Sequence, residues 1–204
     1  MKKIVMLLVF VLSFTIGKAQ LIEFKKLDTA RVYTSLQEAM KNPAYVYRLD
    51  LTRERLREVP SEIYLFTNLN ELILDRNKLK VLPDSLNTLR NLQILSAERN
   101  KLDTINPAIC NLPNLRVLKL GDNYIGGIPD EISNLRQLRV LSLWSNVIAY
   151  YPISLAKLKN LERLDLLANQ MTESEQRRVL SLVGPSVRVD MSQPCDCTFE
   201  DAEN

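Results

Sequence analysis

The sequence repeats itself at a fixed interval of 23 residues. Six aliphatic residues mark the same position in successive repeats: Val46, Leu69, Leu92, Leu115, Leu138 and Leu161. A constant period of this length is typical of a solenoid, in which each repeat buries its apolar edge only against its neighbours. The period therefore predicts the architecture, whereas the ligand of a solenoid is chosen by a few exposed side chains.

The spacing inside each repeat is also constant, and from Leu69 to Leu89 it reads LxxLxLxxNxLxxLPxxLxxL. The LxL pattern puts two side chains on one face of a short strand, so one strand per repeat predicts a parallel sheet with one face buried. Each proline turns the chain back at a place where no ladder donor is needed. The asparagine of each repeat follows the strand, where its amide can bond backbone groups that the sheet leaves unsatisfied. We expect a structural ladder of Asn77, Asn100, Asn123, Asn146 and Asn169.

On this template, residues 46–191 resemble the leucine-rich repeat family in its 23-residue form with Leu-Pro in the second half. Ras-pathway scaffold proteins and short exported bacterial repeat proteins have this form. The resemblance implies an α/β fold, a right-handed solenoid with a parallel sheet on its concave side. Short helical or irregular segments would cover the convex side.

Three departures from the template are interpreted as packing adjustments. Glu54 replaces the asparagine of the first repeat, as expected for a terminal repeat with a different neighbour. Ala97 replaces a strand leucine, so a neighbour fills the gap or a small void remains. Asn106 takes a proline position and Pro107 follows it, which should change the convex turn locally.

Both ends of the array should carry helical caps, because open ends of a solenoid expose its core. Residues 20–45 form the expected N-terminal cap, with a capping box at Ser35 that starts a short helix. Residues 46–169 hold six repeats, and residues 170–191 hold a helix with a capping box at Thr172 and then an edge strand. In that strand Val187 and Val189 should continue the columns of Leu164 and Leu166. Residues 192–204 are expected to be a flexible tail.

Residues 1–19 are expected to be a signal peptide, with Lys2 and Lys3 before an apolar run and cleavage before Gln20. The run is too short to span a bilayer comfortably, so we expect a periplasmic or secreted protein without an integral membrane segment. Of 27 basic and 24 acidic residues, three bases lie in this segment with no acid, which leaves 24 of each sign. A neutral mature chain gives no support to nucleic-acid binding or to broad adhesion on anionic membranes.

The chain has three cysteines, Cys110, Cys195 and Cys197. Cys195 and Cys197 could close a small disulfide ring, pair with Cys110, join two chains or bind a metal, and an unmodified tail is the simplest alternative.

Histidine is absent from the sequence. This removes the usual general base, the Ser and Cys triads and the common zinc sites. We therefore expect no catalytic residue, no metal site and no cofactor, and the protein should not be an enzyme.

The concave face is the remaining candidate site, because the residues between and after the strand leucines point away from the core. Its first half is charged and its second half is apolar. The candidate partner-binding residues are Trp144, Leu167, Val140, Val117, Arg76, Arg99, Asp75 and Glu98. The acids could neutralise the arginines, or the arginines could bind an acidic peptide. The Trp144 indole could lie flat over Gly121 or stand beside a notch that a partner fills.

These observations favour an exported, monomeric, non-enzymatic module that recognises a protein or peptide on its concave sheet. The alternative is an envelope structural or adhesive protein that acts by self-association or carbohydrate contact. The odd number of cysteines and an exposed edge strand at residues 187–191 support that alternative.

Overall fold

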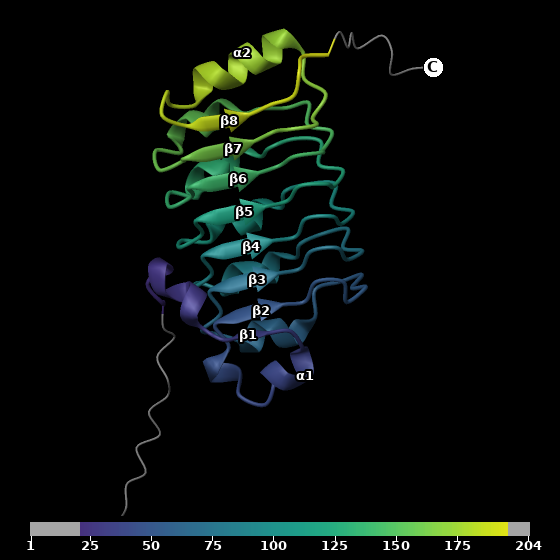
Figure 1. Cartoon of the computed structure of the whole chain (residues 1–204), viewed down its shortest axis with the longest axis vertical. Coiled ribbons are helices and arrows are strands. Elements are labelled where there is room, and N and C mark those ends of the chain that lie inside the picture. The colour runs from purple at the N-terminus through teal and green to yellow at the C-terminus, as the bar shows by residue number, and fades with distance from the viewer. Residues whose placement is uncertain (1–20, 196–204) are drawn as a thin grey trace, which may run out of the picture.

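The structure is a computed structural model and describes residues 21–195. Eight parallel strands form one sheet whose order follows the chain from β1 to β8 (Figure 1). The strands are β1 (Val32–Tyr33), β2 (Arg48–Asp50), β3 (Glu71–Ile73), β4 (Ile94–Ser96), β5 (Val117–Lys119), β6 (Val140–Ser142), β7 (Arg163–Asp165) and β8 (Arg188–Asp190). The α/β solenoid with a parallel sheet, predicted from the repeat, is confirmed.

Short 3₁₀ helices return the chain behind the sheet (Figure 1). These are η3 (Ser61–Leu65), η4 (Asp84–Thr88), η5 (Pro107–Asn111), η6 (Asp130–Asn134) and η7 (Ile153–Lys157). A proline precedes four of them, with φ between −60° and −74°. In the third repeat Asn106 takes over the start of the helix, because its side chain accepts a hydrogen bond from the Ala108 N–H at 2.9 Å. Helix η5 therefore still forms on the convex side despite this departure from the template.

The strands pair with an offset of 23 residues from β2 to β7. Leu72 lies opposite Leu49 on one side and Leu95 on the other, and all three are fully buried. One leucine layer per strand thus forms a continuous core along the array. Ala97 is fully buried within the same core.

The N-terminal cap differs from its prediction. It contains η1 (Phe24–Thr29), α1 (Leu36–Ala39) and η2 (Pro43–Tyr45), and it also adds the edge strand β1, which the sequence pattern did not indicate. Helix α1 begins after Ser35, but Ser35 makes no capping hydrogen bond. The capping box predicted there is wrong, because the Glu38 carboxylate accepts from Arg31 instead.

At the other end, α2 (Glu173–Leu182) covers the last repeat (Figure 1). Its capping box is complete: the Thr172 N–H donates to Glu175 Oε2 at 2.7 Å and the Glu175 N–H donates to Thr172 Oγ1 at 3.3 Å.

The predicted register of the last strand is wrong by two residues, because Leu164 lies opposite Val189 rather than Val187. The return path is longer here, since α2 has ten residues where η7 has five.

Three expectations fall wholly or largely outside the described residues, namely the signal peptide at residues 1–19, the tail at residues 192–204 and the partner cysteine Cys197. Cys110 is buried and carries a free thiol. Within residues 21–195, no helix is long and apolar enough to cross a bilayer.

Candidate functional site

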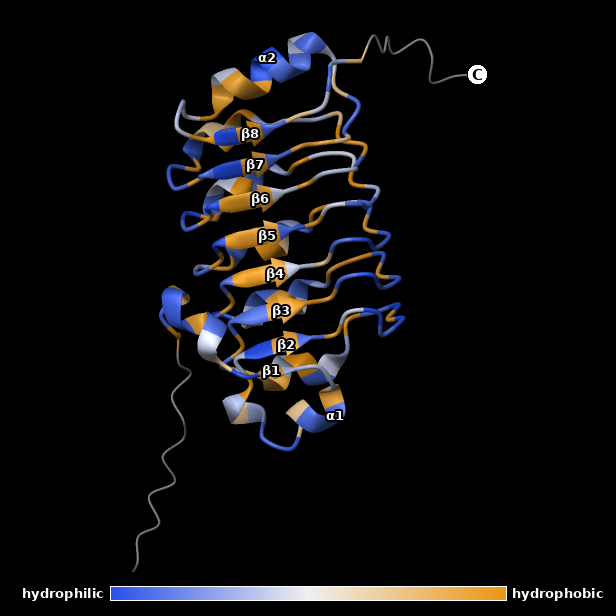
Figure 2. Ribbon diagram, viewed as in Figure 1, coloured by the Kyte–Doolittle hydropathy of each residue, from blue (hydrophilic) through white to orange (hydrophobic). Residues whose placement is uncertain are grey.

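The exposed side of β2 to β7 is the candidate site, and we call it the sheet face. Ile94, Val117 and Val140 lie side by side on the central strands, and each is partly exposed. Charged strands flank them, which Figure 2 shows as blue segments on β2 and β7 around orange segments on β4, β5 and β6. The sheet face is therefore an apolar strip with charged ends rather than a simple division into two halves.

The charges at the two ends of the strip are paired. Arg48 bonds Glu71, which is buried, at the N-terminal end. At the C-terminal end the Arg163 Nε donates to Asp190 Oδ2 at 2.7 Å. This hydrogen bond, with a second one from Arg188, lowers the pKa of the Asp190 carboxyl. These pairs occupy the ends, so a partner would find its free contacts between them.

Trp144 lies over Gly121 of the preceding repeat. A Cβ atom added to Gly121 would come within 2.0 Å of Trp144 Nε1, so only glycine fits beneath this indole. The Trp144 Nε1–H donates to Glu98 Oε1 at 3.0 Å, and the Arg99 guanidinium lies 5.7 Å from the centroid of the ring. The indole is thus held in place by two earlier repeats while part of its surface stays exposed.

Asp75 and Glu98 do not pair with the arginines that follow them. Asp75 Oδ1 accepts from the Ser96 hydroxyl at 2.7 Å and from the Glu98 N–H at 2.8 Å. Glu98 accepts from Trp144. The interpretation of a lattice neutralised by these two acids is therefore wrong, because both carboxylates serve to order the sheet face.

Arg76 and Arg99 lie at the border of the sheet face and are exposed. Arg99 has one ion pair, 3.8 Å from Asp122. Among residues 21–195, Arg76 forms no ion pair or side-chain hydrogen bond. Leu167 lies beyond Trp144 in the same column and is 42% exposed.

Lys119 is not among the partner-binding residues predicted from the sequence, although it is the one charged residue of β4, β5 and β6. It is exposed between Ser96 and Ser142, at the centre of the sheet face. Within the described chain its ammonium has no hydrogen-bond or ion-pair partner. Its place between two serine positions in an apolar strip was the signal that could have identified it.

The five asparagines at the bends form a continuous hydrogen-bonded ladder. Asn100 is typical: its Nδ2 donates to the carbonyl oxygens of Leu74 at 3.0 Å and Ala97 at 3.1 Å, and its Oδ1 accepts from the Leu79 N–H at 3.0 Å. The equivalent bonds recur at Asn77, Asn123, Asn146 and Asn169. All five side chains are buried, so they position the sheet face and cannot contact a partner.

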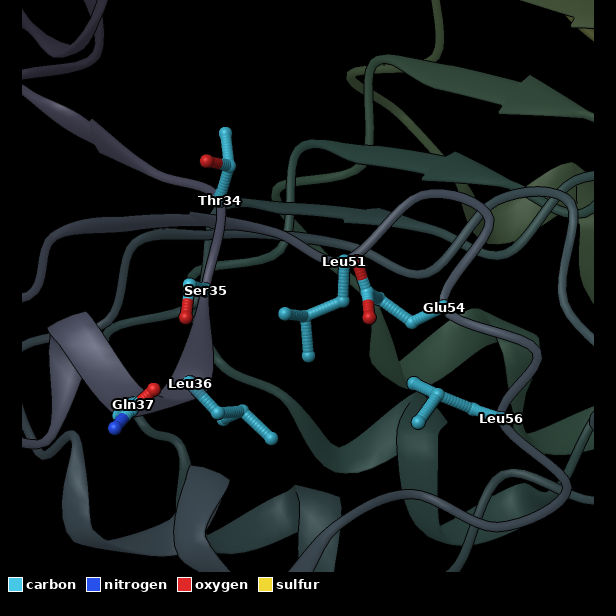
Figure 3. A pocket seen from close by; sticks show the side chains of 7 residues that line it. All are labelled: Thr34, Ser35, Leu36, Gln37, Leu51, Glu54 and Leu56. Carbon is cyan, nitrogen blue, oxygen red and sulfur yellow. The ribbon is translucent and has the colours of Figure 1, made fainter.

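A small cavity of about 220 Å³ lies between the N-terminal cap and the first repeat. Leu36, Leu51 and Leu56 line it, and the Glu54 carboxylate lies beside Leu51 (Figure 3). Glu54 is exposed and does not join the ladder, because no full repeat lies below it. The cavity is smaller than the roughly 300 Å³ at which sites for small molecules usually begin. We therefore assign it to the junction of cap and repeat.

Two buried ionisable groups lie on the convex side, away from the sheet face. Burial, assisted by the charge of Glu131, raises the pKa of the Cys110 thiol to about 12. Burial, assisted by Glu175, also raises the pKa of Tyr151, whose hydroxyl donates to the Ile148 carbonyl oxygen at 3.3 Å. Within residues 21–195, no group of three or more acidic or cysteine side chains is arranged to hold a metal ion.

Comparisons with known proteins agree with the repeat pattern. The family model described as leucine rich repeat matches residues 90–148 and 113–171. Residues 90–171 thus match leucine-rich repeats, as the sequence template predicts. A comparison with curated proteins gives no match.

Three solved leucine-rich repeat structures illustrate the likeness. One from Leptospira interrogans is 30% identical with a TM-score of 0.62, over 81% of this chain and 49% of that one. The ectodomain of the Arabidopsis thaliana receptor kinase GASSHO1/SCHENGEN3, in complex with Casparian strip integrity factor 2, is 30% identical with a TM-score of 0.60, over 77% of this chain and 19% of that one. The plant peptide hormone receptor RGFR1, in complex with RGF2, is 26% identical with a TM-score of 0.52, over 66% of this chain and 23% of that one.

This leucine-rich repeat chain thus spans about half the length of the Leptospira protein and a smaller share of the two receptors. Leucine-rich repeat folds of this kind commonly serve as protein-binding modules, and two of the similar structures hold a bound partner.

Proposed function

We propose that this leucine-rich repeat protein is a non-enzymatic recognition module that binds an extended segment of another protein across its sheet face. The single observation that carries the proposal is the partly exposed Trp144, which bonds Glu98 and lies over Gly121 beside the apolar strip. Tryptophan is a frequent hot spot of interfaces. An anchor that is already ordered loses little conformational entropy when a partner binds.

The roles of the contacts follow from their positions. Val117 and Val140 would pack against apolar side chains of the partner, and Leu167 would extend that contact beyond Trp144. Lys119 would attract a carboxylate at the centre of the strip, and Arg76 and Arg99 would orient acidic groups at its border. Since the chain has no histidine, the usual acid-base catalyst is missing from this surface.

The N-terminal sequence supports export as part of this proposal, because a basic start and an apolar run precede Gln20. The partner would then be a periplasmic, secreted or surface protein, and the chain would act as a monomer.

Self-association through the edge strand has weaker support. Strand β8 is three residues long, and Arg188 donates to Asp190 at 2.9 Å on it. Short, charged edge strands resist pairing with another chain.

The test uses peptides selected from a random display library on the immobilised full-length protein. Trp144→Ala should lower the affinity for the selected peptides by about tenfold or more, which is the range of a hot-spot residue. Tyr45→Ala is the matched control, because Tyr45 is 69% exposed and lies in the N-terminal cap. Val140→Asp should also weaken the selected peptides. Peptides that bind both sheet-face variants as tightly as the unchanged protein would show that the sheet face is not the site.

A further inference from the structure

A dense group of cations lies at the carboxyl ends of β2, β3 and β4, where the chain turns away from the sheet face (Figure 1). It comprises eight exposed residues of the first three repeats, which we call the basic rim: Arg53, Arg55, Arg57, Arg76, Lys78, Lys80, Arg99 and Lys101. In the second and third repeats the exposed cations alternate with buried residues, as Arg76, Lys78 and Lys80 do with Asn77 and Leu79. The cations of these repeats are therefore left on the solvent side of the bend.

Backbone hydrogen bonds hold these segments in register. The Arg76 N–H donates to the Glu98 carbonyl oxygen at 2.8 Å, and the Lys101 N–H donates to the Leu79 carbonyl oxygen at 2.8 Å. Neighbouring chains in such a ladder lie about 4.8 Å apart. The basic rim is thus a compact group of positive charges on a hydrogen-bonded backbone.

Few of these charges are neutralised. Within residues 21–195, Arg99 forms the one ion pair of the basic rim, with Asp122 at 3.8 Å. The same segments contain three acids, Glu54, Glu58 and Asp103, and two more, Asp75 and Glu98, directly precede them, so eight cations minus five acids leave an excess of three. None of these five acids lies within ion-pair distance of a described cation.

The rim is confined to one half of the array. The equivalent positions of the last three repeats hold no cation: Asp122, Tyr124, Gly126, Ser145, Val147, Ala149, Ala168, Gln170 and Thr172. A fully solvated side of a neutral solenoid has no physical reason to concentrate one sign of charge in this way. Like charges held close together repel one another even in water.

We propose that the basic rim binds an extended acidic segment of a partner protein, with aspartate or glutamate on alternate residues. In such an extended segment alternate side chains point the same way, so its carboxylates would all face the rim. Five of the eight cations are arginines, whose guanidinium groups hold carboxylates through two parallel hydrogen bonds. Single-stranded nucleic acid fits less well, because it requires aromatic stacking platforms and the rim contains no aromatic residue.

The basic rim is a second surface beside the sheet face, and Arg76 and Arg99 border both. The test therefore reverses three cations that belong to the rim alone, Arg55→Glu, Lys78→Glu and Lys80→Glu. The matched control reverses Arg136, Lys157 and Arg178, which are exposed on other parts of the array. Both triple variants change the net charge equally, and circular dichroism with a thermal melt checks that both fold.

The probe is a fluorescein-labelled peptide in which glutamate alternates with serine, compared by anisotropy with a peptide that has glutamine in place of glutamate. We expect the glutamate peptide to bind, and we expect its affinity to fall as the salt concentration is raised. The rim variant should lose about tenfold or more in affinity, as charge-assisted hydrogen bonds imply, while the control changes by less than about twofold. Leu167→Ala, in the last repeat of the sheet face, should bind the probe normally, so failure here would leave the sheet-face proposal intact.

Three outcomes would overturn the assignment. The glutamine peptide could bind as well as the glutamate peptide, or both charge-reversed variants could lose affinity equally. Tighter binding of an oligothymidine than of the glutamate peptide would assign the rim to nucleic acid instead.

Discussion

At the scale of single residues, the most unusual feature is a column of left-handed residues that contains no glycine. Each repeat places a residue with positive φ directly before its ladder position, namely Arg53, Arg76, Arg99, Asp122, Ser145 and Ala168, and the first repeat has a second one at Arg55. Side chains rarely adopt this conformation, because Cβ approaches the following carbonyl oxygen. Every bend of the array therefore contains a slightly strained backbone residue. Where an asparagine follows, its side-chain hydrogen bonds to the backbone stabilise this conformation.

Ala168→Gly should raise the stability, because Ala168 has φ of 55° and gains nothing from its methyl group at an exposed position. We expect the free energy of unfolding to rise by about 0.5–1 kcal/mol, after subtracting the extra freedom of glycine in the unfolded chain. Urea denaturation measures this change.

Ala149→Gly is the control for that substitution. Ala149 is also exposed but does not have a positive φ, so glycine there should lower the stability by a few tenths of a kcal/mol or more. Equal effects of the two substitutions would contradict the account of backbone strain.

At the scale of elements, the repeat pattern predicts the strands, because their leucines and the ladder asparagines recur at fixed spacing. The pattern fails at the two ends of the array, where the fixed spacing stops. Strand β1 carries two residues and no LxL pattern, and β8 is displaced because α2 lengthens the path to it. Contacts between repeats were equally hidden: Trp144 and Glu98 are 46 residues apart, and no local pattern indicates their hydrogen bond. Sequence therefore predicts which residues face outward but not which of them satisfy one another.

The two caps provide a matched pair of substitutions. Thr172→Ala should lower the free energy of unfolding by about 1 kcal/mol, because it removes one half of a formed capping box at α2. Ser35→Ala should have an effect close to zero, because Ser35 makes no side-chain capping bond at α1. Helical circular dichroism during urea denaturation compares the two variants. A larger loss for Ser35→Ala than for Thr172→Ala would refute the assignment of the caps.

At the scale of the whole molecule, one continuous apolar core runs along the array, and the buried polar groups include the asparagine ladder as well as the carboxylates of Glu71 and Asp165. The two binding surfaces that we propose, the sheet face and the basic rim, both lie outside this core. Burial raises the pKa of both Cys110 and Tyr151, so both side chains are protonated at neutral pH. Stability should therefore fall on the alkaline side.

The direction of that dependence follows from the pKa of Cys110, which burial raises from its ordinary value of 9.0 to about 12 in the folded protein. Because the folded value is the higher one, the stabilisation is complete below pH 9 and is lost as the pH rises through 12. Between about pH 7 and about pH 10, the unchanged protein should lose about 1 kcal/mol more than Cys110→Ala under reducing conditions. Urea denaturation at the two pH values measures each loss separately, so a lower starting stability of the variant does not matter. The variant should still lose some stability through Tyr151, whereas an identical loss in both proteins would show that the thiol does not remain protonated in the core.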